Sequence, residues 1–595
     1  MMVLHVVVFK GFSQSIHALK TWCLGQTGVG ICALMSIFST LLARGYFPKE
    51  LPPAFFTEQF AKYAATKNGR STITNYKPSD NYTECVKYQL ARPGLDRREL
   101  RVPHPASFAN LASLTAANFS RLLKKAGGSK MSRSRPVYGT GGHRALLPVV
   151  KHSDLPRERV AIRAGSSFLL KTDVSQFYPS LYTHAVGWAV DPPLRSRSNW
   201  GNSNFLGQKL DQALMNLDGK VSQGVPIGND VSFLVAELVL AQVDKVLKSQ
   251  HARAFRWFDD YELATDTREE AEAILKQLNR ELGKFRLRLN PKKTTISRLP
   301  SPAQDHWQQT LRTFRISNSQ SLVQFFDTAF RFRDQFPDEP VMMYALRLLF
   351  KIHTPAHDMA RMALSCITQA LLCEPGAPQK AFALLTFWRI NGTNLDAQLM
   401  TNTVNKMIVG HQAIGFSSDV AWALAFCLDQ QFSLGSEAGQ ALSVFDDDCI
   451  ALQALHMEQK GSLSKGFNKR RISNALKNAD LDREHWLIAY ESVRHGFLTV
   501  CAAAVNSNPL FSDLLKNNVT FYRQSLPLYA SVIHLGGAPN WIVRQWLALL
   551  KGEVPDVDLG PSEAVPAPAP LMELIGKDYA RVVGRSRVPR MLRLS

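Results

Sequence analysis

The sequence AFRWFDDYELAT, residues 254–265, predicts two short strands joined by a tight acidic turn. Aromatic and apolar residues lead into the turn, Asp259 and Asp260 occupy it, and Tyr261 to Thr265 leave it. Adjacent carboxylates repel each other and are costly to hold together unless a cation lies between them, which in proteins is commonly a divalent metal. The turn is therefore a candidate metal site.

Acidic pairs are common in a chain with 49 Asp and Glu residues, so the turn needs support from the rest of the sequence. The triplet Phe-Asp-Asp occurs again at residues 445–447, between two segments with helical patterning, where it predicts a loop. The triplet alone therefore does not identify a site.

Three further segments add polar groups to the same predicted sheet. Residues 168–173 (FLLKTD) predict a buried strand that ends in Asp173, although an N-cap for the next helix would explain this Asp equally well. Residues 222–232 (SQGVPIGNDVS) form a Gly- and Pro-rich loop before an apolar helix, and residues 267–296 predict a helix, a strand and a turn. Together they predict an α+β fold that brings three carboxylates from separated segments to one sheet edge.

Composition and charge limit the classes of function. At 595 residues the chain is long enough for two or three domains, and its 45% hydrophobic and 10% aromatic content is typical of globular protein. A net charge of +21 favours a polyanionic partner, either nucleic acid or an anionic membrane. Eight scattered cysteines without a CxxC pair indicate neither a structural zinc nor a disulfide framework, so we expect a cytoplasmic location.

The apolar run at residues 29–43 is the only stretch that argues for a membrane, and it is shorter than the roughly 20 residues of a spanning helix. A buried helix is the preferred interpretation, with a second helix over residues 54–67. We therefore predict no membrane partner. Translation from Met35 instead of Met1 stays an open alternative.

Four of these segments resemble the motifs of a known family. TDVSQFYPSLYTH, SQGVPIGNDVS, RWFDDYEL and LRLNPKKT resemble motifs A, B, C and D of reverse transcriptases, in the order of that family, across residues 168–296. FYPSLYTHAVGWA, the QGVPIG loop and RGYFPKELPPAFFT are similar to bacterial defence reverse transcriptases of the abortive-infection type.

The resemblance implies a right-hand polymerase, with palm and fingers, that is followed by an all-α HEAT-like helical repeat domain and acts in antiphage defence. Its substrates would be dNTPs and its product DNA, and we expect a homo-oligomer. Several family members are understood to synthesise DNA without a template, primed from a protein tyrosine. Whether this chain copies an RNA or DNA template, and which of its 14 tyrosines could act as primer, is left open.

The resemblance also implies roles for the three carboxylates. Asp173 and Asp259 would hold two divalent ions, Mg²⁺ or Mn²⁺, and Asp260 would support the same cluster. Two such ions stabilise the attacking and the leaving oxygen when a 3′-oxygen attacks the α-phosphate of a nucleotide. Trp257 and Phe258 depart from the family, which usually has Tyr and a smaller residue at these positions.

The resemblance also implies which residues contact the nucleotide. Tyr178 matches the bulky gate that excludes a ribose 2′-hydroxyl, Gln223 and Gly224 match the loop beside the nascent base pair, and Lys293 matches the lysine near the triphosphate.

Basic residues dominate the segment 121–163, directly before the acidic strands. A run of charge is most often a solvated surface, but positive charge beside paired carboxylates suits an enzyme that handles phosphates. From this run we select Arg144 and Arg163 as phosphate or nucleic-acid contacts.

Four regions are expected along the chain: an N-terminal helical segment at 1–70, fingers and palm at 71–304, helical repeats at 305–552, and a Pro/Ala linker with a basic tail at 553–595. Within the third region the helical pattern is clear at 342–353, 357–372, 378–390, 418–432, 449–459, 483–497 and 538–551, with a period near 40 residues per helix pair. Its tryptophans are expected in the core rather than on a nucleic-acid platform: Trp388, Trp422, Trp486, Trp541 and Trp546.

Two other functions stay open. A degenerate polymerase could act as an interaction or sensor module whose helical domain binds a phage or host factor. An RNA polymerase or nucleotide cyclase on the same fold is disfavoured by Tyr178 and by the Gly/Pro loop.

Overall fold

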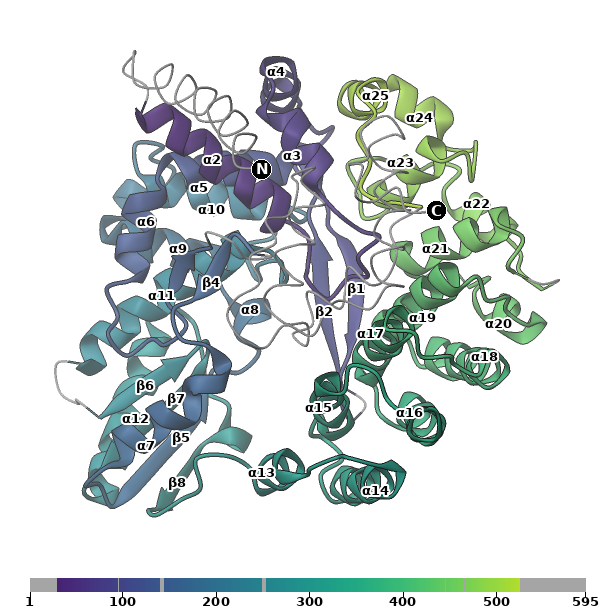
Figure 1. The fold of residues 1–595 in the computed structure, drawn as a ribbon. Coiled ribbons are helices and arrows are strands. Elements are labelled where there is room, and N and C mark those ends of the chain that lie inside the picture. Colours follow the sequence, from purple (N-terminus) through teal and green to yellow (C-terminus); the bar gives the residue numbers. More distant parts are fainter. Residues whose placement is uncertain are drawn as a thin grey trace, which may run out of the picture.

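The computed structural model describes residues 29–94, 96–139, 144–248, 253–444, 446–463 and 466–524 (Figure 1). Most of these residues are helical, and the sheets that they contain all lie before residue 300. The chain therefore combines helices with sheets, as its sequence predicted.

A four-stranded antiparallel sheet forms the centre of the first half. Its strands are β5 (Phe168–Asp173), β6 (Ala254–Trp257), β7 (Asp260–Thr265) and β8 (Thr295–Arg298), in the order β6-β7-β5-β8. The strand predicted at 168–173 and the hairpin predicted at 254–265 are both confirmed. Side chains alternate between the two faces of a strand, so each face needs its own cover.

Helices cover both faces of this sheet. On one face, Leu155 and Ile162 of α7 (Leu155–Arg163) pack against Phe255 of β6. On the other face, α12 (Arg268–Gly283) packs against β5 and β7, and α11 (Asp230–Lys248) packs against α12. The loop at 222–229 therefore leads into a helix that lies directly behind the acidic turn.

The remaining elements of the first half come before the sheet or between its strands β5 and β6. The long predicted helix at 54–67 is wrong in its bounds, because Thr66 caps a new helix by accepting a hydrogen bond from Gly69 N at 3.0 Å. These elements are α2 (Val29–Arg44), α3 (Glu58–Ala65), α4 (Lys67–Asn75), β1 (Val86–Ala91), β2 (Arg97–Val102), α5 (Pro105–Ala117), α6 (Phe119–Ala126), β3 (Pro136–Tyr138), β4 (Leu146–Pro148), α8 (Phe177–Ser180), α9 (Thr183–Val190) and α10 (Leu206–Met215).

The helix predicted at residues 29–43 is confirmed as α2. Leu41 and Leu42 are buried, and the helix packs against α3 and α5. No helix within the described ranges is long and apolar enough to cross a membrane.

Residues 306–516 form helices that curve around the β1–β2 hairpin (Figure 1). Each long helix packs against the helix two places further along the chain, so that α15, α17, α19 and α21 form one layer and α14, α16, α18 and α20 form another. The first of these is the inner layer, and it contacts β1 through α19 and α21. The bounds are α13 (His306–Thr313), α14 (Ser319–Gln335), α15 (Val341–Leu348), α16 (His357–Cys373), α17 (Ala377–Ile390), α18 (Ala397–Ala413), α19 (Ser417–Gln430), α20 (Ser436–Ala441), α21 (Asp448–Gln459), α22 (Arg470–Ala475), α23 (Trp486–Arg494), α24 (Ala502–Ser507) and α25 (Pro509–Lys516).

We call residues 306–516 the helical arc. The segment that follows the arc packs against the segment between α2 and α3, where Phe56 N donates to Phe521 O at 3.0 Å and Arg523 N donates to Ala54 O at 2.8 Å. Trp388, Trp422 and Trp486 are buried, as expected of core residues. Trp541, Trp546, the linker and the basic tail lie outside the described residues.

Candidate active site

The fold brings Asp173, Asp259 and Asp260 together at one end of the four-stranded sheet. Asp173 is the last residue of β5, and its register partner on β7 is Asp260. Asp259 lies in the two-residue turn between β6 and β7, and Val174 N donates to Asp259 O at 3.2 Å. Residues that are 86 positions apart in sequence therefore share one strand end.

The other residue of the turn, Phe258, has a left-handed backbone with φ 53°. This conformation is uncommon for a residue with a bulky side chain. Its ring packs against Phe233 of α11 with centroids 5.3 Å apart, and against Trp257 at 5.1 Å. Phe258 thus anchors the turn to the helix behind it, whereas Trp257 packs against the cluster of Leu155, Ile162 and Phe255 on the α7 side of the sheet.

Negative charge is in excess at this strand end. Lys293 Nζ donates to Asp173 Oδ2 at 2.7 Å, whereas Asp173 Oδ1 is buried and has no hydrogen-bond partner among the described residues. Burial raises the pKa of Asp259, and the charge of Asp173 raises it further. Burial and then the charge of Asp259 raise the pKa of Asp260 to about 6, although Lys293 acts in the opposite direction.

These carboxylates fit a hard divalent cation. Mg²⁺ and Mn²⁺ prefer oxygen ligands, and a cation would satisfy the free oxygen of Asp173 while relieving the repulsion that raises the two pKa values. Within the described ranges no group of three or more His, Cys, Asp and Glu residues is placed to hold a metal ion by itself. An incomplete set suits Mg²⁺, which keeps several waters and typically binds one or two carboxylates together with substrate phosphates.

The Gly- and Pro-rich loop lies beside the segment that follows Asp173. Gly224 N donates to Leu181 O at 2.9 Å, and Gln223 pairs with Tyr182 in an isolated antiparallel bridge. Gly224 has φ +91°, and a Cβ at this position would lie 3.2 Å from Pro179 O. A side chain at position 224 would therefore strain the backbone and press on the neighbouring segment.

Tyr178 belongs to the same small unit. It lies on α8, five residues after Asp173, and its carbonyl accepts a hydrogen bond from Val225 N at 3.1 Å. Burial raises the pKa of the phenol, and the charges of Glu237 and Asp259 raise it further. The side chain therefore stays neutral and bulky at the border of the acidic site.

Arg144 is engaged within the protein. Its guanidinium donates to Asp230 Oδ1 at 2.8 Å, to Phe47 O at 2.6 Å and to Gly228 O at 2.8 Å. It thereby ties the start of α11 to the segment after α2. A phosphate contact from Arg144 stays a prediction, and it would have to compete with these three acceptors.

Arg163, the last residue of α7, is also hydrogen-bonded within the protein. It donates to Glu262 Oε2 at 2.7 Å, to Ser301 O at 3.0 Å and to Pro302 O at 2.9 Å. The side chain is buried, so its observed contacts join α7 to β7. A nucleic-acid contact from Arg163 likewise stays a prediction.

Arg98 is a cation that the sequence reasoning missed. It is an exposed residue of β2, and its charge lowers the pKa of Asp259 against the larger effects of burial and of Asp173. The β1–β2 hairpin thus carries positive charge toward the acidic turn. The signal in the sequence was the group of three arginines in the strand RRELRV at 97–102, after the turn at Gly94.

Comparison with known families identifies the domain that contains this site. Residues 148–322 match the family described as "Reverse transcriptase (RNA-dependent DNA polymerase)". The matched region includes the four-stranded sheet, the three aspartates, Tyr178 and Lys293. The chain therefore contains a reverse transcriptase domain with a polymerase fold.

Comparison with solved structures finds similarity to apo telomerase from Candida tropicalis, with 11% identity over 62% of this chain and 70% of that chain and a TM-score of 0.30. Telomerase from Candida albicans, in complex with the TWJ fragment of telomeric RNA, has 11% identity over 71% of this chain and 70% of that chain and a TM-score of 0.25. Comparison with curated proteins gives no match. The domain assignment thus rests on the family match and on the four motifs.

Proposed function

We propose that this protein is a DNA polymerase that adds dNTPs with the help of two divalent ions, Mg²⁺ or Mn²⁺. The observation that carries the proposal is the facing pair Asp173 and Asp260, with Asp259 in the adjoining turn and one oxygen of Asp173 buried without a partner in the described part of the chain. These three residues would hold the ions, which supply charge stabilisation to an in-line displacement at phosphorus.

The other predicted residues would position the nucleotide. Tyr178 would exclude the 2′-hydroxyl of a ribose by its bulk, and the loop at Gln223 and Gly224 would lie beside the base pair. Lys293 has a side chain that is 66% exposed and contacts Asp173, so it can turn from the carboxylate to a triphosphate. Positioning and electrostatic stabilisation supply most of the catalysis in phosphoryl transfer.

The biological role is proposed from the family resemblance. Motifs similar to abortive-infection reverse transcriptases favour a cytoplasmic antiphage enzyme, active as a homo-oligomer, with synthesis that is untemplated and primed from a protein tyrosine. A HEAT-like architecture for the helical arc is supported by the packing of each helix on the one two places ahead.

The direct test is incorporation of each labelled dNTP by the purified full-length chain with Mg²⁺ or Mn²⁺ and no added nucleic acid. We expect Asp259→Asn to lower the rate by about 10²-fold or more. The amide lacks the negative charge that would hold the divalent ions, and these ions would stabilise the charge on the reacting phosphate. Asp446→Asn is the matched control. It changes the exposed acid of the second Phe-Asp-Asp triplet, which lies in the loop before α21.

Three outcomes separate the candidate functions. Label that stays on the protein after nuclease treatment and boiling would support protein priming. Normal incorporation by Asp259→Asn would contradict the proposed active site. Full phage protection by an inactive Asp259→Asn variant would favour the interaction module instead.

A further inference from the structure

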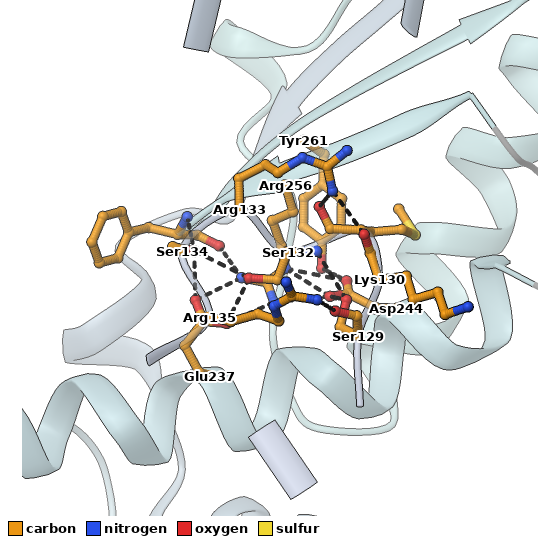
Figure 2. Close-up of polar contacts among 12 residues, drawn as sticks. Ser129, Lys130, Ser132, Arg133, Ser134, Arg135, Glu237, Asp244, Arg256 and Tyr261 are labelled. Carbon is orange, nitrogen blue, oxygen red and sulfur yellow. Dashed lines mark hydrogen bonds and ion pairs between the residues drawn. The ribbon is translucent and has the colours of Figure 1, made fainter. Parts of the chain in front are cut away.

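A buried polar cluster contacts the acidic turn through the backbone of Phe258. Figure 2 shows the hydrogen bonds and ion pairs within this cluster. Its members come from the segment 129–135, from α11 and from the β6–β7 hairpin, and each is at most 2% exposed. We call these residues the Arg256 cluster: Ser129, Ser132, Ser134, Glu237, Asp244, Arg256 and Tyr261.

The guanidinium of Arg256 uses every one of its N–H groups. Nη1 and Nη2 donate to the two oxygens of Glu237 at 2.9 and 3.0 Å, and Nε and Nη2 donate to Asp244 Oδ2 at 3.0 and 2.8 Å. The remaining N–H of Nη1 donates to Phe258 O at 2.5 Å. Five donors in a planar fork are a property of arginine that lysine does not share.

The cluster buries one cation with two anions, and hydroxyl groups compensate for the imbalance. Ser129 donates to Asp244 at 2.6 Å, Tyr261 donates to Asp244 at 3.1 Å, and Ser134 donates to Glu237 at 2.7 Å. Burial lowers the pKa of Arg256, but the two carboxylates raise it by more, so the net pKa lies above the ordinary value. Because all partners are satisfied, the cluster is rigid.

This cluster contacts the turn at a single residue, Phe258, and at both of its backbone polar groups. Phe258 N donates to Ser134 Oγ at 2.7 Å, while Phe258 O accepts from Arg256. Phe258 is also the turn residue with φ 53°, a conformation that persists only where its surroundings hold it. The next residue along the chain is Asp259.

We propose that Arg256 and Ser134 are positioning residues, which hold the turn between β6 and β7 in its left-handed conformation and thereby set the directions of Asp259 and Asp260. The importance of this role for catalysis rests on the proposed polymerase function. We call the hydrogen bonds of Ser134 and Arg256 to Phe258 the clamp. The clamp also joins the segment 129–135 to the sheet, because this segment pairs with the outer edge of β6, where Arg133 N donates to Arg256 O at 2.8 Å.

Ser134→Ala and Ser129→Ala make a matched pair. Each removes one buried hydroxyl that donates to a carboxylate of the cluster, but only Ser134 also accepts from the turn. We expect Ser134→Ala to lower kcat for dNTP addition by about 10- to 100-fold with little change in KM, because small misplacements of reacting groups have effects of this size. Ser129→Ala should keep kcat within about threefold at a similar melting temperature.

A second substitution tests the conformation itself. Glycine adopts positive φ without strain, so Phe258→Gly should restore part of the kcat that Ser134→Ala loses. A merely structural role for Ser134 predicts no such rescue. Equal kcat values for the two serine variants would overturn the proposal.

Hydrogen exchange provides a readout that does not depend on polymerase activity. Mass spectrometry of peptides that cover residues 254–263 should show faster exchange at the turn in Ser134→Ala than in Ser129→Ala, because Phe258 N–H loses its acceptor. Equal exchange in the two variants would overturn the clamp. An inactive wild-type protein with this exchange difference would instead contradict the polymerase function and leave the clamp supported.

Discussion

At the residue scale, Tyr178 combines bulk with a neutral phenol beside the acidic turn. Tyr178→Ala should raise the ratio of rNTP to dNTP kcat/KM by about 10- to 100-fold, since loss of a steric contact in a pocket changes discrimination by this order. Steady-state kinetics with one dNTP and its matching rNTP give the ratio. Tyr178→Phe, which keeps the ring, should behave as the wild type, and an unchanged ratio in Tyr178→Ala would rule out a gate at this position.

The same scale shows which residues a sequence can reveal. Asp173, Asp259 and Asp260 could be selected because each follows or lies within a recognisable strand or turn. The contacts of Arg144 and Arg163 could not, because their partners Asp230 and Glu262 are 86 and 99 positions away. Pairings over such separations depend on how elements pack, which local patterns do not encode.

Arg256, in the segment 254–265, also has contacts that the sequence alone could not predict. It was visible as a charged residue in an otherwise apolar strand, and the structure shows it completely buried. Its function depends on Glu237, Asp244 and Ser134, which lie on two other elements.

At the element scale, strong periodicity was sufficient to predict several helices of the helical arc. The patterns at 357–372, 378–390 and 449–459 correspond closely to α16, α17 and α21. Neither α14 nor α18 was selected, and α18 explains why: Thr403 and His411 occupy buried positions among its apolar residues and weaken the pattern. Asp446 and Asp447 of the second Phe-Asp-Asp triplet lie in a loop, as predicted, and Asp447 caps α21 by accepting from Cys449 N and Ile450 N.

The loop at 222–229 can be tested with two glycines of similar backbone. Gly224 and Gly165 both have positive φ, so alanine at either position strains the backbone by about 1–3 kcal/mol. Only at Gly224 would the added Cβ meet a neighbour, Pro179 O, in the segment that carries Tyr178. Gly224→Ala should therefore raise KM for dNTP several-fold more than Gly165→Ala at equal loss of melting temperature. Identical kinetics in the two variants would show that the loop does not contact the nucleotide.

At the scale of the whole molecule, charge is divided unevenly along the chain. Residues 1–304 contain 42 Lys and Arg against 23 Asp and Glu, whereas residues 305–524 contain 20 of each. Electrostatic attraction for a polyanion therefore arises mainly in the half that includes the reverse transcriptase sheet. The helical arc, which is neutral and packs against β1, is better suited to hold the hairpin than to attract nucleic acid.

The arc closes on the N-terminal half at a junction around His104. The imidazole is fully buried, it stacks on Tyr76 with centroids 5.6 Å apart, and it meets Trp486 and Phe511 edge to face. Neither ring nitrogen has a hydrogen-bond partner in the part of the chain that the structure describes, and Asp482 Oδ1 lies 3.9 Å from Nε2. This aromatic contact joins α23 and α25 to the loop before α5.

Burial lowers the pKa of His104 to about 3, well below the value near 6.5 of an exposed histidine. The unfolded chain therefore binds a proton that the folded chain excludes, and stability falls as the pH drops from about 6.5 toward 3. At about 1.4 kcal/mol per pH unit, the change from pH 6.5 to pH 5 amounts to roughly 2 kcal/mol. His104→Phe keeps an aromatic ring at the junction but cannot bind the proton, so its melting temperature should fall less between pH 7 and pH 5 than that of the wild type. An equal fall in melting temperature for the two proteins between pH 7 and pH 5 would show that protonation of His104 does not open the junction.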